Sequence, residues 1–266
     1  MPLHVEVSGA GQPLVMLHGW SMHGGIWQEV ATELARDLEI HNVDLPGHGL
    51  SGNARDAAAH AYSLDAIVDA LCDAFTEPVN VLGWSLGGII AQRWAQREPN
   101  RVRRLVLMAS TPCFATRADW AAGMSPELLD QFGADLAHHF AETLRRFLGL
   151  QLRGSEGERE VLATLRARLF SRGEPDMPAL LGGLAILRDA DLRSGLGGIT
   201  QPALIIAGER DRLTPAAASR YMAQAMPNAR VVEIAGAAHA PFLSHPQACV
   251  AAIRDFMKGS AHGERI

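Results

Sequence analysis

Short apolar runs separated by segments with helical patterning are the feature that most constrains the fold of this 266-residue chain. Their length suits strands buried on both faces of a sheet, because buried helices need longer stretches. Strands that alternate with helices predict a mostly parallel central sheet flanked by helices, and therefore an α/β fold. The runs cover residues 14–17, 38–43, 79–82, 105–109, 203–207 and 231–234, and an alternating segment at 3–7 predicts an edge strand.

The alternation stops between residues 109 and 202. Helix-like stretches occur there without a convincing strand, at 127–141, 142–152, 159–170 and 179–187. Ligands of parallel sheets bind at the carboxyl ends of the strands. We therefore predict a helical cap, residues 113–190, inserted over those ends between core segments 1–112 and 191–266. One continuous α/β domain with long helices is the alternative.

Composition excludes several classes of function. The net charge of −5 argues against nucleic acid as the main partner, since phosphate binding depends on a basic surface. No apolar run approaches the ~20 residues of a membrane span, and no secretory signal is visible at the start. The three cysteines lack metal-like spacing, which favours buried thiols in a reducing compartment. We expect a cytoplasmic monomer.

The pentapeptide Gly83-Trp84-Ser85-Leu86-Gly87 follows one apolar run and precedes a helix-like segment. In that context the pattern G-x-S-x-G predicts a nucleophile elbow, a sharp turn that exposes the serine hydroxyl. Glycine on either side removes side chains that would clash in so tight a turn. An ordinary strand-to-helix turn is the alternative unless the chain also supplies a base, an acid and an oxyanion site.

A base and an acid follow later strands in the expected order. His239 comes after the last apolar run through a loop of small residues, and Asp211 comes just past the run at 203–207. A histidine activates a serine hydroxyl, and an acid orients the imidazole. The order Ser85, Asp211, His239 is typical of the α/β-hydrolase fold. Glu209 and Asp44 are the rival acids.

An oxyanion hole requires two backbone N–H groups aimed at the developing charge. We expect one from Leu86, at the start of the helix after the nucleophile, and one from Trp20, in the loop after the run at 14–17. His18 is expected to brace that loop. No nucleotide-binding glycine pattern follows a strand, and His138-His139 is expected to be polar surface. No metal and no cofactor are implied.

With these residues in place the chain resembles the α/β-hydrolase superfamily over nearly its full length. The segment Asp44-Leu45-Pro46-Gly47-His48-Gly49-Leu50-Ser51 matches a loop typical of it. Further matches resemble the family of pimeloyl-[acyl-carrier protein] methyl ester esterases of biotin synthesis (BioH). They are Leu17-His18-Gly19-Trp20, Gly83 to Gly88, Pro112-Cys113-Phe114, the cap segments 146–151 and 182–187, and residues 238–246.

That resemblance implies which residues contact the substrate. They are Trp20, Ser85, Leu86, Phe147, Leu148, Gly149, Leu150, Gln151 and His239. Five apolar residues of the cap region would line a slot for a methylene chain, unless they simply make core: Phe114, Trp120, Phe147, Leu148 and Leu187. The implied partner is an acyl carrier protein that bears a pimeloyl methyl ester.

Positive charge gathers in the cap, where residues 145–172 hold seven arginines and three glutamates. Carrier proteins are acidic, so a basic rim would attract one. The residues predicted to dock it are Arg145, Arg146, Arg153 and Arg159. A solvated, salt-bridged helix surface is the alternative interpretation.

The sequence therefore predicts a serine carboxylesterase that hydrolyses the methyl ester of pimeloyl-acyl carrier protein through an acyl-enzyme on Ser85. The alternative is a general short-chain carboxylesterase, lactonase or C–C bond hydrolase on the same scaffold. A non-catalytic binding protein of this fold is disfavoured by the complete set of Ser85, Asp211 and His239.

Overall fold

The central sheet has the predicted architecture. A computed structural model describes residues 2–51 and 62–259, and within them seven strands form one sheet in the order β1-β3-β2-β4-β5-β6-β7. The edge strand β1 runs antiparallel to β3, and the other pairs are parallel. The strands are β1 (His4–Gly9), β2 (Gln12–Leu17), β3 (Leu38–Asp44), β4 (Val79–Trp84), β5 (Val102–Met108), β6 (Ala203–Gly208) and β7 (Ala229–Ile234). The α/β fold class is confirmed.

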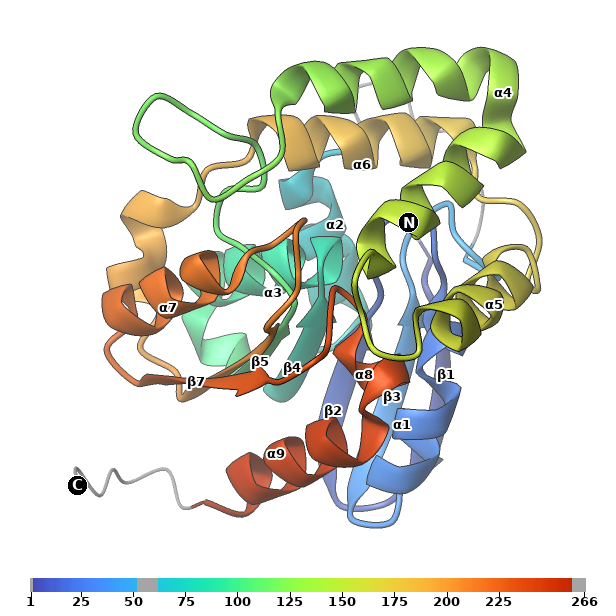
Figure 1. The fold of residues 1–266 in the computed structure, drawn as a ribbon. Coiled ribbons are helices and arrows are strands. Elements are labelled where there is room, and N and C mark those ends of the chain that lie inside the picture. The colour runs from blue at the N-terminus through green and yellow to red at the C-terminus, as the bar shows by residue number, and fades with distance from the viewer. Residues whose placement is uncertain (1, 52–61, 260–266) are drawn as a thin grey trace.

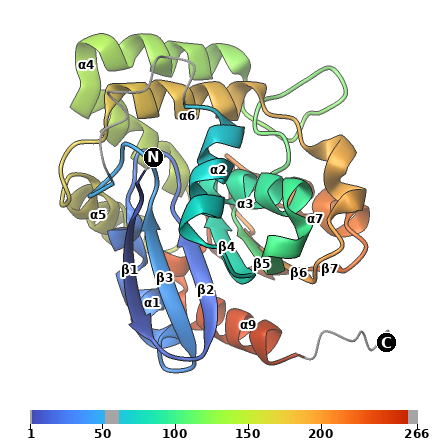
Figure 2. The same cartoon turned by 180° about the vertical axis from the view of Figure 1, so that it is seen from behind.

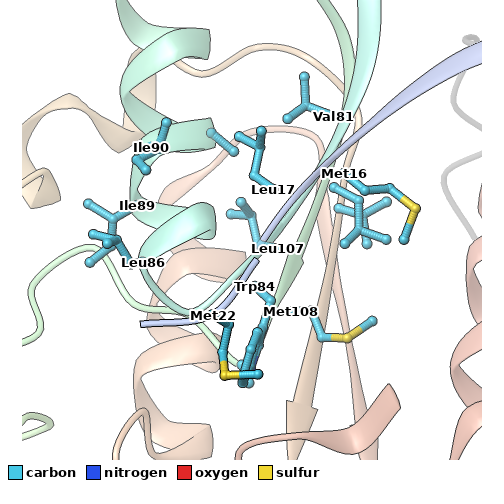
Figure 3. Close-up of a cluster of buried hydrophobic side chains, with 14 of the residues drawn as sticks. Met16, Leu17, Met22, Val81, Trp84, Leu86, Ile89, Ile90, Leu107 and Met108 are labelled. Atoms are coloured by element: carbon cyan, nitrogen blue, oxygen red, sulfur yellow. The ribbon is translucent and has the colours of Figure 1, made fainter. Parts of the chain in front are cut away.

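Burial explains why the middle strands are apolar throughout. Every residue of β4 and β6 is buried, whereas β1 and β7 at the sheet edges are half exposed. Consecutive side chains of a strand point to opposite faces, so both faces of a central strand need apolar residues. Figure 3 shows this for Met16 and Leu17 of β2, which point to opposite sides of the sheet. Ile90, in the helix that follows β4, lies on the Leu17 side.

Helices cover both faces of the sheet. Helices α1 (Gln28–Leu34) and α9 (Pro246–Lys258) pack together on the face seen in Figure 1. Helices α2 (Leu64–Ala74) and α3 (Leu86–Arg97) cover the other face, seen in Figure 2. The remaining core elements are α7 (Ala216–Ala225), α8 (Pro241–Ser244) and the 3-10 turns η1 (Gly24–Trp27), η3 (Pro99–Arg101) and η4 (Arg193–Gly198).

Three helices lie between β5 and β6, where the cap is predicted. They are α4 (Pro126–Leu152), α5 (Glu158–Leu169) and α6 (Met177–Asp189), and they gather beyond one end of the sheet (Figures 1 and 2). Backbone bonds identify that end. His239 N–H, after β7, donates to Gln151 O of α4 at 3.1 Å, and Asp176 N–H, before α6, donates to Gly47 O, after β3, at 2.8 Å. These helices therefore contact loops at the carboxyl ends of the strands.

The two helices predicted for 127–141 and 142–152 are present as the two halves of α4, which meet at a kink two residues before the predicted boundary. Within α4, His139 has non-helical angles, φ −136° and ψ 48°. No proline stands at the break, so a proline does not cause it. Beyond it the second half of α4 descends toward the sheet (Figure 1), where Phe147, Leu148 and Leu152 are buried.

Two further observations concern the whole described chain. None of the helices within residues 2–51 and 62–259 is long and apolar enough to cross a membrane. Cys113 and Cys249 are buried free thiols and Cys72 is half-buried, as the sequence predicts.

Candidate active site

Ser85 lies in a strained turn between β4 and α3. Its backbone has φ 54° and ψ −117°, a conformation that a residue with a side chain rarely adopts. The flanking glycines make the turn possible: a Cβ on Gly83 would lie 2.2 Å from Gly87 O, and one on Gly87 would lie 2.3 Å from Leu17 O. The sequence pattern therefore has the steric basis that an elbow requires.

The structure brings the three predicted triad residues together. Ser85 Oγ lies 2.9 Å from His239 Nε2, and His239 Nδ1 lies 2.8 Å from Asp211 Oδ2. All three side chains are buried. The main chain of His239 is held as well, because Trp84 Nε1–H donates to His239 O at 2.7 Å. A serine, an imidazole and a carboxylate in line at these distances can pass a proton from hydroxyl to ring.

Asp211 is fixed by its own turn, a feature that the sequence reasoning missed. Its Oδ1 accepts from the N–H groups of Leu213 and Thr214, and its Oδ2 accepts from Thr214 Oγ1 at 2.6 Å. The segment Asp211-Arg212-Leu213-Thr214 before α7 carried the signal, since an aspartate commonly bonds backbone amides two and three residues ahead. These bonds hold the carboxylate that faces His239.

The two rival acids have other partners. Glu209 accepts from Gly236 N–H at 2.9 Å. Asp44 accepts from Gly24 N–H at 2.6 Å and Leu50 N–H at 2.8 Å, and Arg172 contacts it at 3.2 Å. Burial alone would raise the pKa of Asp44, but these bonds and charges lower it overall, so the carboxylate stays ionised as a loop anchor.

Another glycine that the sequence reasoning passed over lets the base approach the acid. Gly208 ends β6, and a Cβ there would lie 2.1 Å from Ala238 O, in the loop that carries His239. A side chain at this position would push the base loop away from the acid loop. Glycine at the end of a buried strand, three residues before the acid, was the available signal.

The loop that carries Trp20 stands beside the nucleophile. A Cβ on Gly19 would lie 3.3 Å from Ser85 Cβ. Leu86 occupies the first position of α3, where a backbone N–H has no partner within the helix. The structure therefore places both predicted donor residues next to Ser85. The Trp20 side chain is 2% exposed, and its Nε1–H donates to Leu180 O of α6 at 2.9 Å.

His18 braces this loop, as predicted. Leu45 N–H donates to His18 Nε2 at 2.9 Å, so the proton of the neutral ring is on Nδ1, which donates to Gly19 O at 2.8 Å. Burial and the neighbouring His48 lower the pKa of His18 to about 3. The ring is thus neutral at physiological pH, and charging it would break the bond from Leu45.

The cap residues predicted to contact substrate or to line the slot differ in where they pack. Phe147 packs edge-on against Trp20, with ring centroids 4.8 Å apart, and Leu148 and Gln151 are also buried. Trp120 lies elsewhere, in a separate cluster with Cys113 and Ala218. Phe114, Leu148 and Leu187 belong to the main core, while Gly149 and Leu150 are half-buried.

The predicted docking arginines differ in how free they are. Arg146 pairs with Asp135 and lies over the Phe132 ring, and Arg145 lies 6.0 Å from the Phe170 ring centroid. Arg153 and Arg159 are exposed and have no ion pair with another described residue. Outside the predicted set, Arg172 pairs with Glu6 and Asp44, so it faces the core.

Within the described residues, no group of three or more histidine, cysteine or acidic side chains could hold a metal ion. His138 and His139 are exposed.

Comparisons with known proteins agree with this geometry. Residues 12–246 match the family described as the alpha/beta hydrolase fold. The chain is 48% identical to the pimeloyl-[acyl-carrier protein] methyl ester esterase of Nitrosomonas europaea, over 92% of this chain and 95% of that protein. The protein of the same name from Chromobacterium violaceum is 42% identical over 98% of this chain and 100% of its own length.

Solved structures show the same fold with different activities. An esterase from Exiguobacterium antarcticum superposes with a TM-score of 0.85 at 24% identity, over 97% of this chain and 96% of that one. An enol-lactonase from Burkholderia xenovorans gives 0.82 at 23%, over 97% and 96%. At these identities the likeness shows the fold alone.

Proposed function

This chain belongs to the alpha/beta-hydrolase family and, within it, to the pimeloyl-[acyl-carrier protein] methyl ester esterases, and from that premise we propose how it works. It is a serine carboxylesterase that hydrolyses the methyl ester of a pimeloyl group carried by acyl carrier protein. The observation that carries the reaction is the contact of 2.9 Å between Ser85 Oγ and His239 Nε2. The proposed substrate rests on the names of the relatives and on their sequence identity to this chain.

Ser85 Oγ attacks the ester carbonyl while His239 Nε2 takes the hydroxyl proton. Asp211 accepts from His239 Nδ1–H and so keeps Nε2 free to act as the base. When the tetrahedral intermediate collapses, His239 returns the proton to the leaving methoxide, and methanol departs. The pimeloyl carbonyl is then bound to Ser85 as an acyl-enzyme.

The N–H groups of Trp20 and Leu86 stabilise the oxyanion of each tetrahedral intermediate. One such donor contributes about 2.7–4 kcal/mol of transition-state stabilisation. Both residues lie against the nucleophile turn, and their positions follow from β2 and α3. Water activated by His239 finally frees the acyl group, which leaves a carboxylate and restores Ser85.

The cap supplies the substrate's surroundings in this proposal. Phe147 packs against Trp20 and, with the buried Leu148, is proposed to offer apolar surface to a methylene chain, each buried CH₂ of which is worth ~0.8 kcal/mol. Arg153 and Arg159 are the cap arginines most available to an acidic carrier protein. Carrier-bound substrate also makes the cytoplasm the expected place of action.

Growth of a biotin-requiring bacterial strain that lacks its own esterase tests the proposal. The wild-type chain should restore growth without biotin, and Ser85→Ala, expressed to the same level, should not. Growth with Ser85→Ala would contradict the mechanism. Failure of the wild type to restore growth, together with brisk hydrolysis of p-nitrophenyl acetate, would assign the chain to general ester hydrolysis.

A further inference from the structure

Helix α6 of the cap touches both residues that supply the proposed oxyanion donors. Its Leu180 O accepts from Trp20 Nε1–H at 2.9 Å. One turn on, Gly183 is so close that a Cβ there would lie 2.6 Å from Trp20 Cδ1 and 3.5 Å from Leu86 Cδ2. A contact below 3.0 Å forces some atom to move, and Trp20 is 2% exposed, so its indole has little room.

The loop that follows Trp20 contains a residue in a strained backbone conformation. Ser21 has φ 66°, a left-handed conformation that costs a residue with a side chain about 1–2 kcal/mol. Such residues persist where the surrounding structure fixes them. Ser21 is buried, and its hydroxyl has no hydrogen-bond partner among the described residues. The backbone bond from Met22 N–H to Gly19 O at 3.2 Å closes the turn, and the Ser21 side chain adds no hydrogen bond to it, so contacts from neighbouring elements contribute to fixing the loop.

Cap residues supply several of those contacts. Phe147 of α4 packs edge-on against the Trp20 ring. At the far end of the loop, His23 Nδ1 accepts from Gly25 N–H, so its Nε2–H donates to Arg168 O of α5 at 2.7 Å. From the core side the loop is held by His18. The loop is thus clamped between core and cap.

We propose that α6 positions the oxyanion hole: Leu180 O and the bare backbone of Gly183 hold the Trp20 indole, and through it the Trp20 N–H. Gly183 is then a positioning residue that touches no reacting atom. The cap that bounds the substrate also sets the rate of the chemical step. The inference rests on the oxyanion role given to Trp20 in the proposed function.

The test compares alanine substitutions at three cap glycines. Gly183→Ala places a methyl against Trp20, Gly182→Ala places one 2.5 Å from Tyr62 Cδ1, and at Gly133 the nearest atoms are 3.9 Å away. The substrate is p-nitrophenyl butyrate, and the second readout is inhibition by a trifluoromethyl ketone, whose adduct with Ser85 places an oxyanion between the two amides.

In Gly183→Ala we expect kcat to fall by about 10²-fold, since a donor displaced by about 1 Å costs that much. The inhibition constant of the ketone should rise by a similar factor, while KM changes little. Gly133→Ala should match the wild type. Gly182→Ala should lower the melting temperature and leave kcat and the inhibition constant nearly unchanged.

Two results would overturn the proposal. One is an unchanged kcat and inhibition constant in folded Gly183→Ala. The other is an equal loss in Gly182→Ala, which would make general displacement of α6 the cause. If Gly183→Ala does not fold, Trp20→Phe decides, because it removes the five-membered ring of the indole, and with it both the N–H that bonds Leu180 O and the edge that packs on Gly183: kcat must fall and the inhibition constant must rise.

The assay separates this inference from the proposed function. Loss of p-nitrophenyl butyrate hydrolysis in Ser85→Ala establishes the nucleophile without any carrier protein. An enzyme that cleaves this ester but not the carrier-bound one would refute the proposed substrate and leave the role of Gly183 standing. Normal catalysis by Gly183→Ala would refute the role of Gly183 and leave the proposed substrate standing.

Discussion

The sheet core and the cap reach the active site by different routes. Ser85, Asp211 and His239 extend side chains from loops that follow β4, β6 and β7. The cap contacts loops of the site through its main chain: Gln151 O accepts from His239 N–H, after β7, and Leu180 O accepts from the indole of Trp20, after β2. In the proposed mechanism the proton-transferring side chains therefore come from the core, while the cap contributes backbone acceptors that hold neighbouring loops.

This difference makes the two regions separable by substrate. Substitution of a core side chain that moves protons should slow every ester alike. Substitution of an exposed cap side chain should slow only the substrate that the cap recognises.

The largest effect is expected at the acid. Asp211→Asn keeps the shape of the side chain but favours the wrong imidazole tautomer, so kcat should fall on the order of 10⁴-fold for both carrier-bound and p-nitrophenyl esters. Steady-state kinetics with the two substrates measures this. Glu209→Gln, which retains an acceptor for Gly236 N–H, is the control and should keep its activity. A large loss of kcat in Glu209→Gln, together with a normal kcat in Asp211→Asn, would assign the acid to Glu209 instead.

An effect of intermediate size is expected from low pH, which acts on His18 at the core side of the loop that carries Trp20. Unfolded histidine takes up its proton near pH 6.5, whereas burial lowers the pKa of His18 to about 3 in the folded chain. Between these values the unfolded state binds more protons than the folded state, so the free energy of unfolding decreases as the pH is lowered. This one group removes about 1.4 kcal/mol per pH unit below 6.5, or about 2 kcal/mol at pH 5.

Urea unfolding at pH 7, 6 and 5 checks the acid dependence. His18→Asn should lose stability at pH 7 and show a shallower decline toward pH 5 than the wild type. His138→Asn, at an exposed position on α4, should decline as the wild type does. Parallel curves for the wild type and His18→Asn would mean that His18 does not control the stability of the loop under acid.

The smallest effect is expected at the cap surface. Reversing the charge of Arg153 and Arg159 together should lower kcat/KM for the carrier-bound ester about tenfold at low salt, since steering by charge accelerates encounter by at least that much. Turnover of p-nitrophenyl acetate should not change. Arg103→Glu, at the start of β5, is the matched control. A loss that is equal for both substrates would remove the distinction between cap and core.

Much of the core could be predicted because its signals are local. Apolar runs and the turns that end them identify β4, β6 and β7, and the catalytic candidates stand directly after those strands. The glycines around Ser85 have a local steric reason. The bonds from Leu213 and Thr214 to Asp211 were also local, and a reading of aspartate turns would have found them.

The cap was harder to predict because its contacts are distant in sequence. The bond from Trp20 to Leu180 joins residues 160 positions apart, and neither residue type signals it. Two cap arginines, Arg168 and Arg172, turn to Gln28, Glu6 and Asp44 of the core, which composition could not show. The kink at His139 has no proline to signal it in the sequence.

The intact mass of a carrier protein bearing methyl pimeloyl, taken before and after exposure to the enzyme, tests the central claim most directly. With the wild type, the acylated protein should lose the mass of one methylene unit and keep its thioester, while Ser85→Ala should leave the mass unchanged. An unchanged mass with active wild type, or release of the free pantetheinyl thiol, would contradict the account.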